Sequence, residues 1–503
     1  MGGVLFRGNA EEKIREQLVL SGFLKGIIGL PANLFYGTGI PACILVLDKA
    51  GASTRKGVYM VDASKGFIKD GPKNRLRDQD IHKIVDAFSK LADMPGFAKM
   101  VPREDIIGEK NGCNLNLPRY IDSIEPEDLQ DLDGHLRGGI PERDLDALAP
   151  YWNVMPGLRA ALFEGAGRPG YWRFRDAGSE VKTVVTAHPE FIAFDAAART
   201  TFNEWAARNS AALRTFDKDG RPKVLIASLS EDLLAAFRAV PLLNAYDVYQ
   251  HLMTYWLETM QDDCYLVAAD GWTAGAKPRE LKQVKNKDNK LVWAEAHDYK
   301  KGAVRFKADL IPGPVLTARY FGAERDLIAT LDADIAEIER KIEEELEERG
   351  FEGGPLDEGV VVDENKRKIT AKSVKDALKK LGTDPDYEEE RSALKVCRAL
   401  FDSGTEAKSR LKKGREDLDA KLAAKYARLT EAEIKTLVVD DKWLASLAAA
   451  VQGELDRVSQ SLTGRIRELA ERYATPLPKL SDEVDALSAR VDEHLKRMGA
   501  SWK

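Results

Sequence analysis

The residues best suited to chemistry are two adjacent aromatic side chains, Phe35 and Tyr36, which the polar side chains of Asn33 and Thr38 flank. An aromatic ring can stack on a planar ligand, and an amide or a hydroxyl can form hydrogen bonds to the ligand or within the loop. Prolines and glycines surround the pair, at positions 31, 37, 39 and 41. Proline excludes the α region for the residue before it, and glycine permits positive φ. The stretch therefore predicts a constrained loop that presents two rings.

Two strands must hold this loop. Residues 27–30 and 43–47 are apolar runs of strand length on either side of it. The second run, Cys-Ile-Leu-Val-Leu, is unbroken, which is typical of a strand buried on both faces inside an α/β sheet. The loop would then lie at the carboxyl end of a strand, where open α/β sheets bind their ligands.

The neighbouring elements add only a small α/β piece. A helix is predicted over residues 10–21, with Asn9 as N-cap and Glu12 as its partner in a capping box. A third strand is predicted over residues 58–62, and residues 1–6 read as the tail of a strand and a loop. Buried strands need partner strands and covering helices. We therefore expect an unfinished sheet edge at this N-terminal end.

Length and composition set the outer bounds. The chain has 503 residues, of which 44% are hydrophobic, enough for about two to four domains with proper cores. A net charge of −6 excludes a polyelectrolyte ligand for nucleic acid, so such contacts would need local basic patches or a partner. The four cysteines form no CxxC pair and the histidines show no metal-ligand spacing. Without a long apolar run or a signal-like start, a soluble cytoplasmic protein that contacts no membrane is expected.

Residues 30–41, LPANLFYGTGIP, resemble the LPxNLFYxTxIP signature of the modification subunit of type I restriction–modification systems. Further resemblances lie at residues 114–120 (NLNLPRY), 246–252 (YDVYQHL) and 440–443 (DDKW), so they span nearly the whole chain. The resemblance implies a DNA adenine-N6 methyltransferase with a Rossmann-like domain and S-adenosylmethionine as methyl donor. It also implies double-stranded DNA, a specificity subunit, a second modification subunit and a restriction (motor) subunit as partners.

The resemblance also gives the aromatic pair a role. This class of methyltransferase stacks an aromatic side chain on the target base after the base leaves the duplex, and Phe35 matches that position. Tyr36, Asn33 and Thr38 join it as target-base candidates, although a role within the loop is favoured for the last two. The alternative is that both aromatic rings are core residues that cover the end of the sheet.

The residues that perform methyl transfer in this family are not found. Its D/N-P-P-F/Y loop binds the adenine amino group, and this chain contains no Pro-Pro pair. Residues 163–170, FEGAGRPG, are the best Gly-rich candidate for the cofactor, but they follow a predicted helix and are expected to form a plain loop. The chain is thus predicted to be the C-terminal portion of an N-terminally truncated modification subunit. Alone it would lack catalytic, cofactor-binding and metal-binding residues and be inactive.

Two basic clusters, residues 277–290 and 300–307, are candidates for phosphate contacts. The proposed DNA-backbone residues are Lys282, Lys285, Lys287, Lys301 and Arg305. A solvated surface loop is the commoner explanation of such lysines. Another basic run, residues 366–380, is expected to face solvent or a partner within a linker. His251 is expected to be a core or interface residue.

The predicted fold class is mixed, with three contiguous regions. Residues 1–125 would be the incomplete α/β piece, residues 126–320 a helix-rich middle with helices at 189–210, 230–239 and 244–261, and residues 321–503 a long-helix region for subunit association. Apolar residues at alternating steps of three and four predict coiled-coil-like seams over 328–346, 451–473 and 484–495. A linker is expected after the first seam.

Three functions are compatible with these features. The chain can be the C-terminal portion of a methyltransferase modification subunit, which we favour. It can be one half of a split enzyme, with the cofactor-binding and NPPF-type motifs on another polypeptide. It can also be a non-catalytic helical adaptor that docks on the specificity subunit. The first two predict an open sheet edge, whereas an adaptor predicts an edge blunted by charge or proline.

Overall fold

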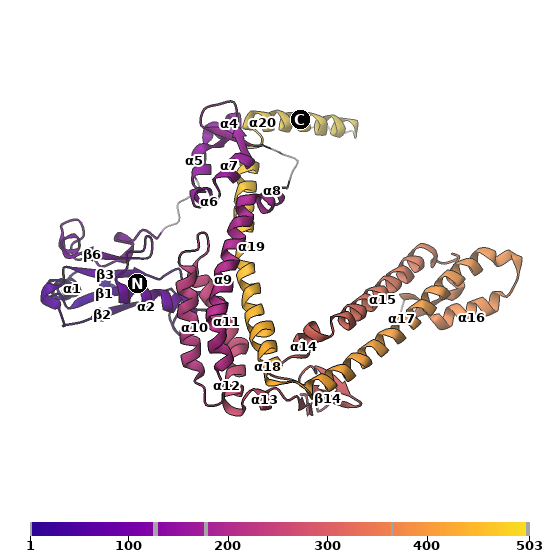
Figure 1. Cartoon of the computed structure of the whole chain (residues 1–503). Helices are drawn as coiled ribbons and strands as arrows, with labels where there is room; N and C mark the ends of the chain where they lie inside the picture. The colour runs from indigo at the N-terminus through magenta and orange to yellow at the C-terminus, as the bar shows by residue number, and fades with distance from the viewer. Residues whose placement is uncertain (1–2, 124–128, 176–179, 364–365, 499–503) are drawn as a thin grey trace. The chain divides into compact units, whose positions relative to one another are not determined.

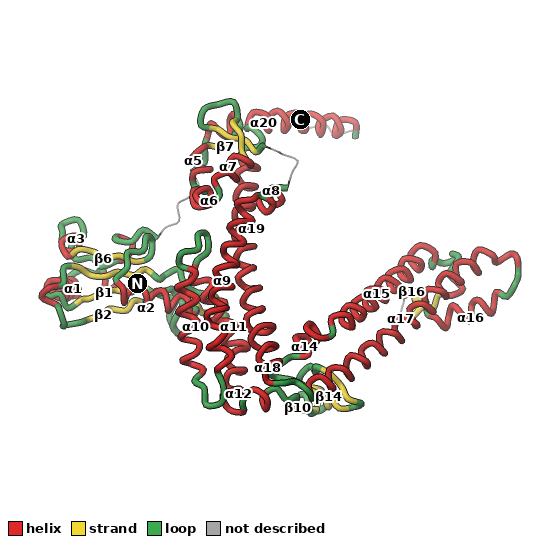
Figure 2. Tube along the Cα trace, viewed as in Figure 1, coloured by secondary structure: helices red, strands yellow, loops and turns green. Residues whose placement is uncertain are grey.

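The computed structural model describes residues 3–123, 129–175, 180–363 and 366–498 (Figure 1). Helices predominate, and small sheets lie between them (Figure 2). The chain forms two compact units, and neither is contiguous in sequence. The first unit contains Met1–Asn209, Lys223–Thr259 and Leu447–Lys503, and the second contains Ser210–Pro222 and Met260–Ser446. The three contiguous regions predicted from sequence therefore do not describe how the helices group, because the chain leaves the first unit and returns to it.

A four-stranded sheet forms the N-terminal α/β piece. Its strands are β1 (Leu24–Gly29), β2 (Cys43–Leu47), β3 (Gly57–Asp62) and β6 (Ala98–Pro102), in the order β2-β1-β3-β6. β1 and β3 are parallel, and the other two pairs are antiparallel. Gly26 of β1 is needed for packing, because a Cβ there would lie 2.5 Å from the ring of Phe88 and 2.6 Å from the carbonyl oxygen of Tyr59.

β2 and β6 are the two edge strands of this sheet, and two predictions about the N-terminal residues were wrong. β2 is not buried on both faces, since the side chains of Ile44 and Leu47 are 47% and 57% exposed. The buried strands are β1 and β3 instead. Gly3–Leu5 form a 3₁₀ turn rather than a strand tail, because buried Leu5 packs in the core and its carbonyl accepts a hydrogen bond from Leu115 N at 2.8 Å. Met1 and Gly2 lie outside the described residues.

Helices cover both faces of the sheet. α1 (Ala10–Leu20), α3 (Arg103–Ile107) and the apolar residues of 115–121 pack on one face, and α2 (Asp78–Lys90) packs on the other. The helix predicted over 10–21 is thus present, but its capping box is not. Asn9 has φ +62° and its side chain accepts no capping hydrogen bond, because this left-handed conformation differs from the extended backbone of a capping residue.

Short helices and a helical bundle complete the first unit. The helices are α4 (Leu132–Arg137), α5 (Glu142–Asp146), α6 (Ala149–Val154), α7 (Pro156–Leu162), α8 (Val181–Ala187), α9 (Pro189–Thr215), α10 (Pro222–Phe237), α11 (Ala245–Tyr255), α19 (Ala445–Arg472) and α20 (Leu477–Arg497). The remaining strands are β4 (Ile68–Asp70), β5 (Lys73–Arg75), β7 (Ile140–Pro141), β8 (Phe163–Gly165) and β9 (Tyr171–Phe174). The apolar seam of α19 is buried, whereas α20 buries none of its residues.

α11, which carries the YDVYQHL motif, joins the α/β piece to α19. Asp247 accepts a hydrogen bond from Gln79 Nε2 of α2 at 3.0 Å and pairs with Arg457 of α19 at 3.0 Å. His251 lies 2.8 Å from Glu454, also of α19. These contacts place His251 at a helix interface, in line with its predicted role.

Asp86 of α2 accepts hydrogen bonds from three side chains, and these contacts predict that the stability of the fold depends on pH. Burial by itself raises the pKa of Asp86, but hydrogen bonds from Lys90, Tyr246 and Arg238 outweigh burial and lower it to about 2. A carboxyl group whose pKa is lower in the folded than in the unfolded chain stabilises the fold at pH values above its ordinary pKa of 3.8. This stabilisation is lost as the pH falls towards the folded-state pKa of about 2.

Asp86→Asn is therefore expected to lower the free energy of unfolding by about 2 kcal/mol at pH 7. The difference from the unmodified chain should shrink as pH falls from about 4 towards 2. Urea unfolding followed by circular dichroism across this range measures it. Asp376→Asn, at an exposed carboxylate of α16 (Ala371–Leu381), is the control, and an equal loss there would contradict the expectation.

The second unit contains long helices and small sheets. Its helices are α12 (Gln261–Asp270), α13 (Trp272–Gly275), α14 (Gly313–Tyr320), α15 (Gly322–Arg349), α16, α17 (Glu388–Tyr426) and α18 (Glu431–Lys435). Its strands are β10 (Arg279–Glu280), β11 (Gln283–Lys285), β12 (Leu291–Trp293), β13 (Tyr299–Lys301), β14 (Val304–Lys307), β15 (Val360–Asp363) and β16 (Lys366–Ile369). Two π-helical turns are present in the described residues, at Trp256–Met260 and at Thr436–Leu444.

The linker predicted after the first seam is wrong, because this stretch folds. α15 and α17 run side by side, and the hairpin β15–β16 and α16 pack at one end of the pair (Figure 1). Val374, Ala377 and Leu381 recur on one face of α16 and are buried together with Leu394 and Cys397 of α17. The exposed lysines of the run 366–380 follow from this amphipathic pattern, and the side chain of Lys366 lies outside the described residues. Among the described helices, none is both long and apolar enough to cross a membrane.

Candidate functional site

The loop between β1 and β2 follows the carboxyl end of β1. Asn33 and Gly37 adopt positive φ, +55° and +80°. At position 39 a glycine is needed because the side chain of Asn33 lies close to it. A Cβ at Gly39 would lie 3.1 Å from Asn33 Oδ1. The loop is thus bent at two positions, and its two halves approach each other closely.

A short hairpin, β4–β5, braces this loop from outside. Asn74 donates to the carbonyls of Ala32 and Asn33, through Nδ2 at 2.7 Å and through its backbone N at 3.0 Å. Lys73 Nζ donates to the carbonyl of Phe35 at 2.8 Å and lies 5.7 Å from the centre of the Tyr36 ring. The backbone of the loop is therefore fixed by a separate element before any ligand binds.

The aromatic rings of the loop point away from the core. The side chains of Phe35 and Tyr36 are 52% and 94% exposed, so neither ring covers the end of the sheet as a core residue. Leu34 performs that role by packing against the buried cluster of β1 and β3. Exposed aromatic rings on a braced loop are available to stack on a planar group from outside.

The two polar candidates differ in their surroundings. Thr38 Oγ1 accepts a hydrogen bond from Ile40 N at 3.1 Å, which ties the hydroxyl to the loop itself. Asn33 is half-buried, and its side chain faces Gly39. All four sequence candidates of this loop therefore lie together, two as exposed rings and two as residues that shape the backbone.

A polar pocket of about 340 Å³ lies at the carboxyl end of β3, and sequence reasoning missed it. Its lining includes Asp62, Lys83, Asp80 and Asp247. Asp62 accepts hydrogen bonds from Ser64 N at 3.1 Å and from the hydroxyl of Ser123 at 2.8 Å. Burial lowers the pKa of Lys83, against the charges of the two other carboxylates. The only sequence signals were an Asp at the end of a strand and the YDVYQHL motif.

Within the Gly-rich stretch, residues 163–165 form β8 and residues 166–170 form the hairpin turn to β9, so only the second part is the loop that was expected. Gly167 and Gly170 both have φ +76°, as the turn requires. A cofactor turn of the Rossmann type needs a strand before it and a helix N-terminus after it. A strand pair offers no such helix terminus, so these residues do not fit S-adenosylmethionine.

Three of the DNA-backbone candidates, Lys285, Lys301 and Arg305, lie on strands of the second unit, and Lys282 and Lys287 lie on either side of β11. This unit is a different one from that of the aromatic loop. Lys282, Lys285, Lys287 and Lys301 are exposed. Arg305 is half-buried, and its guanidinium lies 4.5 Å from the centre of the Trp293 ring.

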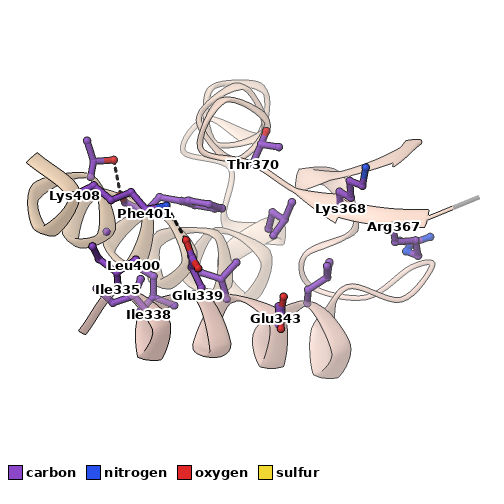
Figure 3. A pocket seen from close by; sticks show the side chains of 15 residues that line it. Ile335, Ile338, Glu339, Glu343, Arg367, Lys368, Thr370, Leu400, Phe401 and Lys408 are labelled. Atoms are coloured by element: carbon purple, nitrogen blue, oxygen red, sulfur yellow. Dashed lines mark hydrogen bonds and ion pairs between the residues drawn. The ribbon is translucent and has the colours of Figure 1, made fainter. Parts of the chain in front are cut away.

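The second unit also has a hollow of about 470 Å³ between α15, α17 and β16 (Figure 3). Ile335, Ile338 and Phe401 supply apolar walls, and Lys408 pairs with Glu339 at 2.8 Å along its rim. This arrangement holds two long helices together, and we assign it no chemistry.

Comparison with known proteins matches residues 1–129 to the N-6 DNA methylase family. The chain is 38% identical over 134 residues to the type I restriction enzyme MjaVIII methylase subunit of Methanocaldococcus jannaschii, which is 26% of this chain and 23% of that protein. It is 36% identical over 128 residues to the MpnII methylase subunit of Mycoplasma pneumoniae, which is 25% and 23% of the two chains.

Among solved structures, the methyltransferase subunit of a type I restriction–modification system from Streptococcus thermophilus is 43% identical over 24% of this chain and 25% of that chain, with a TM-score of 0.23. The chain thus spans about a quarter of the length of the curated relatives it matches. The aromatic loop and the NLNLPRY motif lie inside the matched residues, and the YDVYQHL and DDKW motifs lie outside them. Residues 1–129 are thus similar to the N-6 DNA methylase family and to type I restriction enzyme methylase subunits.

Proposed function

We propose that this chain is a portion of the modification subunit of a type I restriction–modification system, which methylates adenine N6 at specific sites in double-stranded DNA in the cytoplasm. S-adenosylmethionine would supply the methyl group. A specificity subunit would choose the site, and a second modification subunit and a restriction subunit would complete the assembly. The observation that carries the proposal is the braced loop with exposed Phe35 and Tyr36, which lies within the residues matched to the family.

In this proposal the chain supplies one wall of the target-base pocket. A base that leaves the duplex loses its stacking partners, and an exposed aromatic ring replaces part of that stacking. Phe35 would provide the ring, and the contacts of Asn74 and Lys73 would hold its loop in place. A pre-fixed loop spends less conformational freedom when the base binds.

The cofactor and the D/N-P-P-F/Y loop would come from other residues than those of this chain. The Gly-rich hairpin turn does not fit the cofactor, and the 503 residues contain no Pro-Pro pair. We therefore expect no methyl transfer by this chain alone.

The exposed edge strand β2 favours the hypothesis that a further segment extends the sheet, either in the same polypeptide or in another one. Ile44 and Leu47 are apolar and exposed on this edge, and neither charge nor proline interrupts residues 43–47. Proteins usually blunt or cover such an edge. A split or divided methyltransferase thus fits β2 better than a free-standing adaptor does.

The test begins with the DNA upstream of the Met1 codon in the source genome. A segment that encodes a Gly-rich turn and an NPPF-type loop, in frame or in a separate gene, is then expressed with this chain and the specificity subunit. Transfer of tritiated methyl groups from S-adenosylmethionine to duplex DNA should require both polypeptides. Absence of such a segment, or of transfer by the complete set, would overturn the proposal.

Charged residues on β2 test how the two parts would join. The double variant Ile44→Lys with Leu47→Lys is expected to lower the rate of methyl transfer at least about a hundredfold, because lysines on an edge strand prevent another strand from pairing with it. Ile81→Lys together with Val224→Lys, at positions 49% and 62% exposed on α2 and α10, is the matched control. Equal activity of the two double variants would rule out β2 as the joining edge.

A further inference from the structure

We propose that the hairpin β11–β12, with the four lysines Lys282, Lys285, Lys287 and Lys290, binds the phosphate backbone of duplex DNA. These residues are called the lysine hairpin below. The inference rests on the proposed function only in that it takes DNA as the substrate, and it concerns a surface that lies outside the family-matched residues.

The charge of this segment runs against that of the chain. Residues 277–307 contain ten Lys and Arg against four Asp and Glu, whereas the whole chain has a net charge of −6. All four lysines of the hairpin are exposed. Within the described ranges, none of them has a carboxylate oxygen within 4.0 Å, although ion pairs are common elsewhere in the second unit. The lysine hairpin is therefore an excess of positive charge that the chain itself does not neutralise.

The paired and the unpaired charges of residues 277–307 lie in different places. Arg279, at the base of the small sheets, pairs with Glu295 at 2.8 Å and with Asp309 at 2.7 Å. Asp298 accepts hydrogen bonds from the backbone N–H groups of Ala308 at 2.7 Å and Gly313 at 2.8 Å. Two of the four carboxylates of residues 277–307, Glu295 and Asp298, are thus engaged at the base, whereas Asp288 lies in the hairpin turn with the lysines.

The hairpin is a shaped element rather than a loose loop. Its turn is closed by one backbone hydrogen bond, from Asn286 N to the carbonyl of Lys290 at 2.9 Å, and by Asn286 Oδ1, which accepts from Asp288 N and Lys290 N. Asn289 adopts φ +61°, which asparagine tolerates better than most residues. Lysines on a fixed turn lose less freedom when they contact a phosphate than lysines on a flexible tail do.

A stacked aromatic base connects the adjoining sheet to a long helix. Tyr299 of β13 is buried and stacks on Phe306 of β14 and on Tyr426 of α17, with ring centres 5.0 and 5.4 Å apart. The hydroxyl of Tyr426 donates to the carbonyl of Ile311 at 2.7 Å. Arg305 over the ring of Trp293 links β14 to β12. The lysines therefore project from a platform that is anchored in the second unit.

The chemistry of the surface favours a polyanion with regularly spaced charges. Ammonium groups act as point charges that bind phosphate without base specificity, and duplex DNA presents one negative charge per about 1.7 Å of its axis. Contact with phosphates would release counterions, so binding would weaken steeply with salt. Val284, Leu291 and Val292 also expose apolar surface on the hairpin, which makes an acidic protein partner the competing outcome.

The test uses the full chain and a fluorescein-labelled 30-base-pair duplex, in fluorescence anisotropy titrations from about 50 to 200 mM salt. Lys282, Lys285, Lys287 and Lys290 are replaced together by Gln. The dissociation constant at low salt should rise at least about tenfold, and the slope of log K against log salt should fall by about 0.9 for each lysine that contacts a phosphate. This measurement needs no cofactor. Loss of DNA binding by the lysine hairpin and loss of methyl transfer can therefore be observed independently of each other.

The matched control removes four exposed lysines from another surface of the same unit, Lys372, Lys375, Lys379 and Lys395. The control should bind the duplex as the unmodified chain does. An equal loss in both variants would show a general charge effect and overturn the proposal, as would unchanged binding by the hairpin variant. Competition by polyglutamate as strong as that by unlabelled duplex, at equal charge concentration, would assign the surface to an acidic protein instead.

Discussion

Replacing Lys442 with Met is expected to destabilise the second unit by about 3–5 kcal/mol, the largest effect on stability that we expect. Lys442 is 7% exposed and lies in the π-helical turn Thr436–Leu444. Its Nζ lies 2.7 Å from Asp263 Oδ2 and donates to the carbonyl of Leu310 at 2.9 Å. The substitution would leave the carboxylate of Asp263, itself 5% exposed, buried without its cation.

The neighbouring contacts make Asp263 difficult to compensate in another way. Burial raises the pKa of Asp263, although Lys442 and the hydrogen bond from Trp443 Nε1 at 2.8 Å both favour the charged form. The double variant Asp263→Leu with Lys442→Met should recover at least half of the loss, because it removes both charges. Urea unfolding measures both variants, with Lys372→Met as the exposed control. A loss below about 1 kcal/mol for Lys442→Met would contradict a structural role for this pair.

Phe35→Ala is expected to lower kcat/KM for DNA methylation about 5- to 150-fold in the complete enzyme, the largest functional effect that we expect from one residue. The physical reason is the loss of stacking on the target base, which contributes about 1–3 kcal/mol per base. The free energy of unfolding should change little, because the ring is already 52% exposed. Steady-state transfer of tritiated methyl groups to duplex DNA measures the effect.

Two further variants separate stacking from a general loss of aromatic surface. Phe35→Trp should keep most of the activity, because its ring can still stack on the base. Phe351→Ala removes a ring that is 57% exposed in the second unit and should leave kcat/KM unchanged. A duplex with 2-aminopurine at the target position should lose its fluorescence change on binding the Phe35→Ala enzyme. Full activity of Phe35→Ala would assign the target base to other residues.

Local patterns in the sequence predicted local elements well. The strand at residues 43–47, the strand ending at Asp62 and the helix beginning near Ala10 all form close to their predicted bounds, because hydrophobic periodicity and punctuation by Gly and Pro act over a few residues. The aromatic loop follows from the same local constraints. Its left-handed residues are Asn33 and Gly37 rather than the two glycines, because Gly39 serves the packing of Asn33.

Predictions failed where the partner of a segment is distant in sequence. The apolar run of β2 reads like a central strand, yet it is an edge strand, because strand order depends on which strands pair and not on composition. The run 366–380 is polar enough to suggest a linker. It folds because Val374, Ala377 and Leu381 find a buried surface on α17, and nothing local in the sequence points to that helix.

The sequence by itself determined the resemblance of residues 1–129 to the N-6 DNA methylase family, the aromatic loop and the excess of lysines over residues 277–307, since motifs and charge belong to the order of the residues. Only the tertiary structure decided that Phe35 and Tyr36 are exposed, that the hairpin β4–β5 fixes their loop, and that β2 is an edge strand. It also decided which carboxylates neutralise which cations, so that four lysines remain unpaired on one hairpin within the described residues. The physical reason is that burial and ion pairing are set by contacts between residues far apart in the chain, which local propensity does not encode.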